Sequence, residues 1–244
     1  MKGVPLPRKS MRGIPVHRQV RLNTESVDNY LKAIFTLGGP EEKRVAGSAL
    51  ANVLRIAPAS VTNMLQKLAG MPVPLVEYEK HRGILLSPAG KKRALEIIRH
   101  HRLIETFLYK VLDYPIEEIH EEAERLEHFI SERFEERVAA KLGYPKLDPH
   151  GHYIPAMDGR IPKQTSTLLT ESAEEKTFVV DSISDRDPVV LKRLHRLGIG
   201  PGVRFQFSRR TPLGEHIAKI EKLQKTLRLS FELAAAIRVR PILK

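Results

Sequence analysis

Residues 46–68 read AGSALANVLRIAPASVTNMLQKL, and this stretch decides the fold of the N-terminal part. It predicts two short helices, Ala46 to Leu54 and Pro58 to Leu68, because apolar residues recur at helical spacing on either side of a tight turn. Proline at position 58 suits the first position of a helix. An amphipathic segment, Val27 to Leu37, predicts another helix before them. The spacing is that of a helix-turn-helix.

The residues that follow predict a β wing. The sequence LVEYEKHRGILL at 75–86 favours two short strands, Leu75 to Glu79 and Ile84 to Leu86, joined by a tip that contains Lys80 and Arg82. A basic tip beside an uncharged polar helix is not required by packing alone. A helical bundle with an incidental hairpin is the alternative that this pattern leaves open.

The outer face of the second helix has the residue types that read base pairs. Small residues at its N-terminus allow the helix to enter a major groove, Asn can bridge base edges and Lys can reach phosphate. We therefore expect DNA contacts from this helix and the wing. The candidates are Ala59, Ser60, Thr62, Asn63, Lys67, Lys80 and Arg82.

Composition excludes several classes of protein. The chain has 244 residues, with 41 Lys and Arg against 29 Asp and Glu, and no Cys. Disulfide scaffolds and thiolate metal sites are therefore excluded. No apolar run approaches the ~18 residues of a membrane helix, so we expect a cytoplasmic protein with no membrane partner.

The net charge of +12 is unevenly distributed. Residues 1–22 contain basic residues and no acidic one, which predicts a basic flexible tail or an arm that lies along a phosphate backbone. Residues 43–99 are also mostly basic, whereas residues 117–137 are mostly acidic. This polarity suits a protein that meets a polyanion with the first segment and a cation with the second.

Histidines and carboxylates recur at helical intervals in the middle of the chain. Two helices are expected, Ala89 to Leu112 and Ile116 to Leu142, and if they pack with the relevant faces together they can enclose a divalent cation. A solvated acidic helix is the alternative. Imidazole and carboxylate ligands favour Mn²⁺ or Fe²⁺, although Zn²⁺, Co²⁺ and Ni²⁺ would also bind in vitro. The candidate ligands are His101, Glu105, His120, Glu124, Glu127 and His128.

Enzymatic readings find little support in the sequence. A zincin needs His-Glu-x-x-His, which is absent, and a di-iron bundle needs two Glu-x-x-His motifs, of which only Glu117 to His120 fits. No motif places a nucleophile or a phosphate-binding loop. We therefore expect a protein that is not an enzyme and has no small organic substrate.

These motifs, in this order, resemble a known family. The helix-turn-helix, YEKHRG at 78–83, HRLIE at 101–105, HEEAERLEH at 120–128 and DPHGHYIP at 148–155 are similar to the diphtheria toxin repressor and manganese transport regulator family of metal-dependent repressors. The resemblance covers roughly Thr24 to Pro155. It implies a homodimer that binds a double-stranded DNA operator when a metal ion is bound.

The resemblance also assigns ligands. It implies one metal position formed by His101, Glu105 and His120, and a neighbouring one formed by Glu124, Glu127 and His128. Asn29 stands where the two branches of the family have Met or Asp, and Lys32 stands where the manganese branch offers Glu. Glu124, in place of the Cys of the iron branch, implies Mn²⁺ before Fe²⁺.

The C-terminal part changes to short β-like runs from Lys176 onward, which predict a small barrel. Its RLHRLGIGPG motif at 193–202 is similar to the SH3-like domain of the longer repressors of this family and to the iron-transport accessory protein FeoA. In some relatives this domain lends a ligand, and Asp187 is the nearest equivalent here. As the alternative, Asp185 and Asp187 could equally be turn residues. Lys163 to Glu175 is the expected linker.

The expected fold is mainly α with a small β domain. It combines a winged helix-turn-helix, a helical metal-binding and dimerisation domain and a C-terminal SH3-like β-barrel, with boundaries at 1–22, 23–96, 97–162, 163–175 and 176–244. The expected function is a metal-dependent (Mn²⁺ or Fe²⁺) DNA-binding transcriptional regulator, as a repressor of metal-uptake genes at an inverted-repeat operator. The alternative is a metal-buffering or trafficking accessory protein without specific DNA binding.

Overall fold

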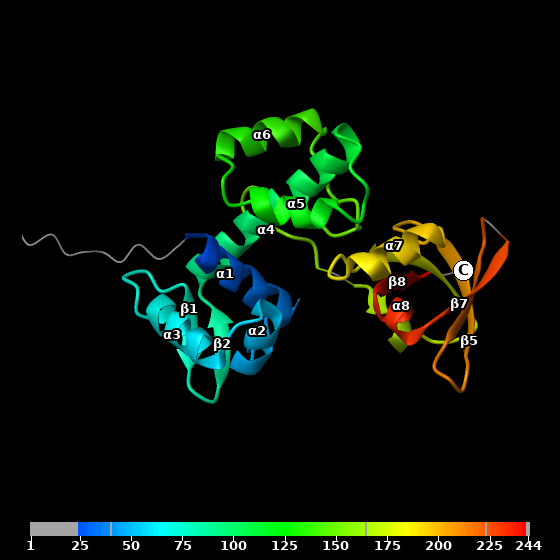
Figure 1. Ribbon diagram of the computed structural model, residues 1–244, viewed down its shortest axis with the longest axis horizontal. Coiled ribbons are helices and arrows are strands. Elements are labelled where there is room, and N and C mark those ends of the chain that lie inside the picture. The colour runs from blue at the N-terminus through cyan, green and yellow to red at the C-terminus, as the bar shows by residue number, and fades with distance from the viewer. Residues whose placement is uncertain (1–23, 40, 164, 223, 243–244) are drawn as a thin grey trace, which may run out of the picture.

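The computed structural model describes residues 24–39, 41–163, 165–222 and 224–242. These residues form three parts in chain order, coloured blue to cyan, green, and yellow to red in Figure 1. The basic tail predicted for residues 1–22 lies outside the described residues. Within the described ranges, no helix combines the length and the apolar character needed to cross a bilayer.

The N-terminal part is a winged helix-turn-helix. Arg55 adopts a left-handed conformation (φ 54°) that ends the second helix, and Pro58 begins the third. Leu31, Leu50 and Leu65 are buried in the core that joins the helices to the wing. The elements are α1 (Thr24–Gly38), α2 (Gly47–Leu54), α3 (Pro58–Ala69), β1 (Val76–Glu79) and β2 (Gly83–Leu86).

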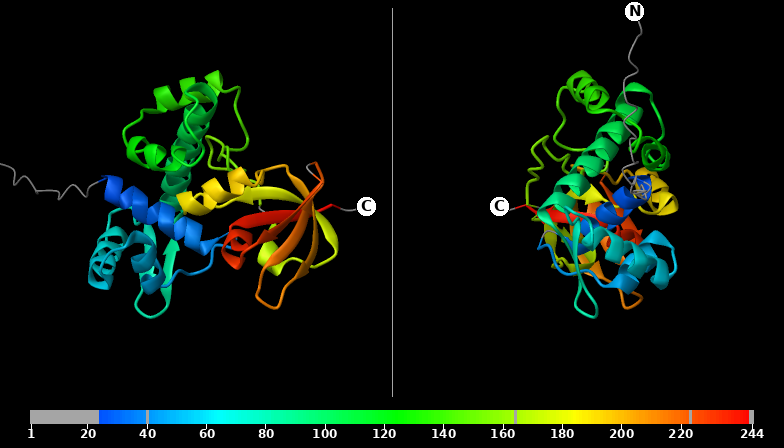
Figure 2. Two further views of the ribbon diagram at one scale, coloured as in Figure 1. Left: turned by 45° about the vertical axis from the view of Figure 1, so that its right-hand side comes forward. Right: turned by 90° about the vertical axis from the view of Figure 1, so that its left-hand side faces the viewer.

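Helix α4 (Pro88–Val111) connects this part to the helical part, as Figures 1 and 2 show. Its N-terminus is capped by Ser87, whose side chain accepts a hydrogen bond from Gly90 N at 3.0 Å. A Cβ at Gly90 would lie only 1.9 Å from the carbonyl oxygen of Leu75, so only glycine permits this contact. The approach fixes the direction in which α4 leaves the wing.

The acidic segment forms two helices rather than the single one predicted from Ile116 to Leu142. Helix α5 (Ile119–Leu126) ends before the bend, and α6 (Glu132–Lys141) begins after it. Ser131 caps α6 by accepting a hydrogen bond from Phe134 N at 3.3 Å, which gives the second helix its own start. The prediction of one continuous helix was therefore wrong.

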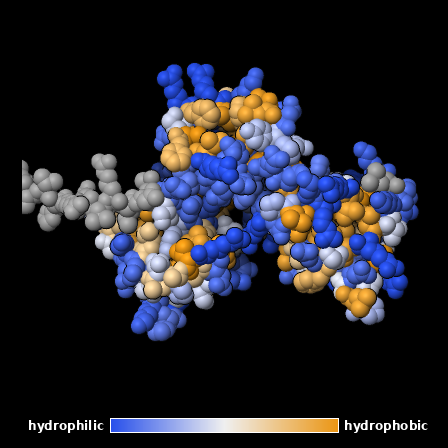
Figure 3. Space-filling view, viewed as in Figure 1, coloured by the Kyte–Doolittle hydropathy of each residue, from blue (hydrophilic) through white to orange (hydrophobic). Residues whose placement is uncertain are grey.

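The helical part exposes several large apolar side chains. Figure 3 shows hydrophobic residues gathered at the top of the molecule, where Figure 1 places α6. Phe129 is 78% exposed, and Phe134 and Leu112 are about half exposed. Val111 and Leu126 are also exposed. Apolar side chains this open on one part of a protein are typical of a surface that a partner covers.

The C-terminal part is an antiparallel sheet with strand order β3-β8-β4-β5-β6-β7. Alternate residues of its strands, such as Phe205 and Phe207, form a core of their own with Leu191 and Leu194 of α7. This agrees with the small SH3-like β domain expected from the sequence. The elements are β3 (Thr167–Leu168), the 3₁₀ helix η1 (Leu169–Glu171), β4 (Lys176–Ile183), α7 (Pro188–Arg196), β5 (Arg204–Arg210), β6 (His216–Ile220), β7 (Lys225–Leu229), α8 (Phe231–Ala235) and β8 (Ile237–Pro241).

The segment expected to be a linker, Lys163 to Glu175, is partly built into this domain. Thr167 and Leu168 pair with β8, and the side chain of Leu169 is fully buried in the C-terminal core. The linker prediction was therefore too long, because a two-residue strand gives no periodic signal.

A backbone seam joins the C-terminal part to the segment that follows α6. Ile183 N, at the end of β4, donates a hydrogen bond to His150 O at 2.9 Å. Gly151 has φ +90°, and a Cβ there would lie 2.3 Å from Asp181 O. The seam places the loop after β4 beside the helical part.

Candidate functional site

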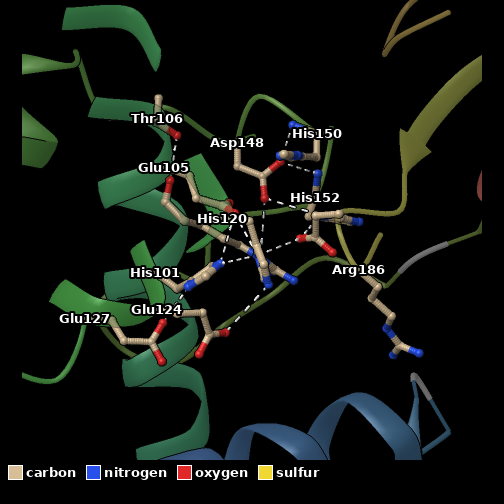
Figure 4. Close-up of polar contacts among 12 residues, drawn as sticks. His101, Glu105, Thr106, His120, Glu124, Glu127, Asp148, His150, His152 and Arg186 are labelled. Carbon is tan, nitrogen blue, oxygen red and sulfur yellow. Dashed lines mark hydrogen bonds and ion pairs between the residues drawn. The ribbon is translucent and has the colours of Figure 1, made fainter. Parts of the chain in front are cut away.

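Helices α4 and α5 bring three predicted donors together. His101 and Glu105 lie one turn apart on α4, and His101 Nε2 is 3.0 Å from Glu105 Oε1. His120 of α5 adds its Nδ1 atom, 3.1 Å from His101 Nε2 and 3.3 Å from Glu105 Oε1. Figure 4 shows the three side chains converging between the two helices. Glu105 is completely buried.

A fourth donor comes from the C-terminal part. Asp185, in the loop after β4, has its Oδ2 atom 3.8 Å from His120 Nδ1. Donor atoms of His101, Glu105, His120 and Asp185 all lie within 4.8 Å of one another. We call these four residues the first donor group.

The structure places Asp187, the expected C-terminal ligand, at the start of α7 and outside both donor groups. Its Oδ1 atom accepts hydrogen bonds from Val189 N at 2.8 Å and Val190 N at 3.2 Å, so it caps α7. Sequence similarity alone could not distinguish the two aspartates. The only feature of the sequence that pointed to Asp185 was its position close to the predicted start of the helix 191–197.

A second donor group shares His101 with the first. Donor atoms of His101, Glu124 and Glu127 lie within 4.8 Å of one another, and His101 Nδ1 is 2.5 Å from Glu127 Oε2. Lys32 of α1 enters this group, with its Nζ atom 2.5 Å from Glu124 Oε1 and 2.6 Å from Glu127 Oε1. The sequence marked Lys32 as a departure but did not reveal these contacts.

Asn29 and His128 lie at the edge of the second group. His128 Nε2 is 3.1 Å from Asn29 Oδ1 and 3.4 Å from Glu127 Oε1. On its other side, His128 Nδ1 is 3.5 Å from Asp28 Oδ2. The structure thus brings all the predicted ligands except Asp187 into one connected cluster.

Neighbouring opposite charges shift the pKa values of the residues in the cluster. Burial alone would lower the pKa of His101, but the charge of Glu105 and hydrogen bonds to Glu105 and Glu127 raise it to about 10. Against the effect of burial, His101 holds the pKa of Glu105 well below its usual range. His101 and Lys32 together overcome burial and lower the pKa of Glu127. The negative charges of Glu105 and Glu127 are therefore neutralised by the protonated His101 ring and by the ammonium group of Lys32. A bound divalent cation can neutralise the same carboxylates.

The first donor group fits a divalent cation of intermediate hardness. Its donors are two imidazoles and two carboxylates, and the chain has no cysteine that could add a thiolate. Glu105 Oε2 is buried and has no hydrogen-bond partner among the described residues, although a buried carboxylate oxygen normally has one. A bound cation would satisfy that oxygen. The donor chemistry is that of Mn²⁺ or Fe²⁺.

The loop 148–152 supplies a second layer of polar side chains that sequence reasoning did not assign to the site. His152 Nδ1 lies 3.3 Å from Asp148 Oδ2 and 3.8 Å from Asp185 Oδ2. Asp148 Oδ1 accepts hydrogen bonds from the backbone of His150 and His152, each at 2.9 Å. Figure 4 shows this loop beside His120. Its His152 side chain helps to hold Asp185 beside the other three residues of the first donor group.

The candidate DNA contacts lie on α3 and at the tip of the wing. Ala59, Ser60, Asn63 and Lys67 of α3 are exposed. Thr62 is half-buried, and its hydroxyl donates to Pro58 O at 3.2 Å. Lys80 and Arg82 are exposed at the wing tip, where Arg82 also pairs with Glu79. The exposed side chains of α3 and the wing are therefore accessible to a DNA duplex.

Models of three protein families match successive parts of the chain. The N-terminal DNA-binding domain of iron dependent repressors matches residues 23–84. The metal binding and dimerisation domain of the same repressors matches residues 87–156, and the FeoA domain matches residues 167–241.

Two curated relatives cover different lengths of the chain. The HTH-type transcriptional regulator MntR of Bacillus pumilus is 37% identical over 111 residues, which are 45% of this chain and 74% of the regulator. The iron-dependent repressor IdeR of Mycobacterium leprae is 27% identical over 232 residues, which are 89% of this chain and 98% of the repressor.

Solved structures resemble the chain across all three parts. A manganese-dependent transcriptional repressor in complex with manganese has a TM-score of 0.81 and 34% identity, covering 88% of this chain and all of its own. ScaR with bound Zn²⁺ has a TM-score of 0.75 and 32% identity, covering 88% of this chain and 99% of its own. Both relatives were solved with metal, in agreement with the donor chemistry described above.

Proposed function

Since the chain belongs to the iron-dependent repressor family of metal-dependent, DNA-binding transcriptional repressors, we propose that it binds an inverted-repeat operator as a homodimer when Mn²⁺ or Fe²⁺ is bound. Its relatives are regulators and not enzymes, as the sequence predicted. Repression of metal-uptake genes is the expected outcome.

The observation that carries this proposal is the connection between α1 and the donor cluster. Asn29 and Lys32 belong to α1, which packs against α2 of the helix-turn-helix, and both contact the segment 124–128. Arg93 of α4 also pairs with Asp28 of α1, with Nε and Oδ1 2.6 Å apart. A change of charge in the cluster therefore acts directly on the element that supports α3.

The proposed ligands of the ion are the four residues of the first donor group. When bound, the ion supplies two positive charges that hold carboxylates from α4 and the C-terminal loop together. Side chains of the protein position the ligands. Glu105 and His101 present their donors from one face of α4. His152, which contacts Asp148, orients Asp185. The result is a fixed arrangement of α4, α5 and the C-terminal loop, and α1 is tied to this arrangement through Lys32 and Asn29.

The partner in the proposed dimer is a second copy of this chain. The apolar side chains exposed on the helical part support this, since Phe129 and Phe134 lie in the segment that matches the metal binding and dimerisation domain. A two-fold dimer would present two copies of α3 to half-sites about 34–36 Å apart, one turn of B-DNA. An operator with inverted repeats follows from that symmetry.

The proposed base contacts come from α3 and the proposed backbone contacts from the wing. Ser60 and Asn63 are exposed toward the N-terminal half of α3, where a recognition helix reads base edges. Lys67 and the wing residues Lys80 and Arg82 carry charge for phosphate. Operator and metal should strengthen each other's binding by the same factor.

The experiment is selection from a pool of random duplex DNA at fixed salt, with and without Mn²⁺, followed by sequencing of the retained fraction. The full chain is compared with His120→Ala, which removes a proposed ligand of the ion from α5. Glu121→Ala is the matched control, because this glutamate lies on the same helix but is 74% exposed and pairs with Arg125.

The proposal expects an inverted repeat that is recovered only with Mn²⁺, is lost in His120→Ala and is kept in Glu121→Ala. Unselective binding that ignores metal would contradict it, because the net charge of +12 would then be sufficient to explain retention.

A further inference from the structure

Lys32 is bound between two carboxylates that belong to the donor cluster. Its Nζ atom is 2.5 Å from Glu124 Oε1 and 2.6 Å from Glu127 Oε1, and its side chain is only 18% exposed. Glu127 is completely buried. An ammonium group with two carboxylate partners at these distances is a firmly held cation and not a passing surface contact.

The two donor groups differ in their need for an added cation. The first group contains Glu105 and Asp185, and no lysine or arginine is paired with either carboxylate among the described ion pairs. The second group contains Glu124 and Glu127, and Lys32 is paired with both. Two separate cations can therefore be accommodated, and the chain itself supplies one of them.

We propose that Lys32 is a built-in cation that takes the place of a second metal ion, so that each chain binds a single divalent ion at His101, Glu105, His120 and Asp185. The inference rests on the proposed function, because it takes that function's metal site as given. It adds the stoichiometry and the residue that sets it.

The position of the ammonium group explains why a second ion is excluded. A divalent ion coordinated by Glu124 and Glu127 would compete with Lys32 for the same two carboxylates. It would also lie within a few ångströms of Nζ, where two positive charges repel strongly in a partly buried site. The second donor group therefore accepts a metal only if Lys32 leaves or loses its charge.

The same residue has a consequence for the DNA-binding part. Lys32 and Asn29 lie one turn apart on α1, and both contact the segment 124–128. This link between α1 and the helical part is present without any metal ion. Metal then binds where α4, α5 and the loop of Asp185 meet, and its effect reaches α1 through the segment that Lys32 and Asn29 contact.

The experiment measures how many Mn²⁺ ions the full-length chain binds. Equilibrium dialysis over a range of free Mn²⁺, with elemental analysis, gives the number bound per chain. Electron paramagnetic resonance of the dialysed samples distinguishes isolated Mn²⁺ from two ions held close together. Operator binding with and without Mn²⁺ is measured on the same samples.

Four variants test the role of the charge. Lys32→Glu adds a carboxylate and Lys32→Met removes the ammonium with little change in length, and each should raise the number from one to two and give the signal of a close pair. Lys32→Arg keeps the charge and should remain at one. Lys225→Glu, which makes the same charge change at an exposed position of β7, is the matched control and should also remain at one.

Two tightly bound ions in the unaltered chain would overturn the inference, and if its operator binding still required Mn²⁺ the proposed function would stand. One ion in the unaltered chain and in both Lys32→Glu and Lys32→Met would also overturn it, since the lysine would then not set the number. Operator binding that ignores Mn²⁺ would instead overturn the proposed function. Using both Glu and Met keeps the result decisive if one variant fails to fold, which circular dichroism reports.

Discussion

Asp185 Oδ2 lies 3.8 Å from His120 Nδ1, so a loop of the C-terminal part reaches the helix that carries the central donors. The same oxygen is 3.8 Å from His152 Nδ1. Burial and the charge of Glu105 would raise the pKa of Asp185, but the charges of His152, His120 and His150 together lower it. The aspartate is therefore ionised and directed at the donor cluster.

Removal of this carboxylate should weaken metal binding selectively. Asp185→Ala is expected to reduce the affinity for Mn²⁺ about 10- to 100-fold, the range typical of groups that support a metal site. Asp187→Ala is the control: it should leave the affinity unchanged but destabilise the C-terminal domain by about 1 kcal/mol, because it removes the cap of α7. Isothermal titration and chemical denaturation measure the two effects. Equal losses of affinity in both variants would contradict the assignment.

Lys67 and Asn63 should affect DNA binding in different ways. Lys67→Ala is expected to weaken binding to all duplexes and to reduce the slope of log K against log salt by about one unit, because one phosphate contact is lost. Asn63→Ala should leave the slope unchanged and relax the preference at one base position. Fluorescence anisotropy at several salt concentrations measures both. A normal slope for Lys67→Ala would exclude a phosphate contact by this lysine.

Two glycines on helices should respond oppositely to alanine. Gly90→Ala places a Cβ 1.9 Å from Leu75 O and is expected to cost about 1–3 kcal/mol of stability or more, because backbone must move. Gly47→Ala, at the start of α2, meets nothing within 4 Å and should be neutral or stabilising by up to about 1 kcal/mol. Urea denaturation compares them. Similar stabilities of the two variants would be inconsistent with the close packing of α4 on the backbone of Leu75, just before β1.

The pKa of His216 makes the stability of the C-terminal part depend on pH. Burial, assisted by the charge of Arg210, lowers this pKa from its ordinary value of 6.5. As the pH falls below 6.5, the unfolded ring gains a proton before the folded ring does, so the free energy of unfolding decreases with falling pH. The loss is complete once the pH is below the folded pKa.

Replacement of His216 isolates this effect. The unaltered chain should lose more stability between pH 7 and pH 5 than His216→Leu, measured by denaturation at each pH. His195→Leu, which changes an exposed histidine of α7, should keep the slope of the unaltered chain. If His216→Leu and the unaltered chain had parallel profiles, the lowered pKa would be refuted.

Much of the N-terminal part could be predicted from the sequence because its signals are local. Pro58 and the turn at Arg55 separate the two helices, and the alternation of Leu75 to Glu79 marks a strand. The break between α5 and α6 could not be predicted in this way. Residues 116–142 contain no Gly or Pro, and only the capping of Phe134 N by Ser131 reveals the second start.

The donor cluster was only partly accessible from the sequence. His101 and Glu105 share a helix face, so their spacing alone places them together. The contacts of Lys32 and Asp185 join elements that are far apart in the chain, and helical periodicity carries no information about them. The choice between Asp185 and Asp187 depended on which carboxylate the backbone of α7 engages, which is a property of the folded loop.

The seam between Ile183 and His150 has a thermodynamic consequence for the metal site. Asp185 lies two residues beyond this hydrogen bond, and Gly151 packs directly on the backbone of β4. The conformational entropy of this loop is therefore lost when the protein folds, and no further entropy of the loop is lost when an ion binds. Asp185 is thus a preorganised ligand. The free energy of ion binding at the first donor group should therefore contain almost no penalty for ordering the loop.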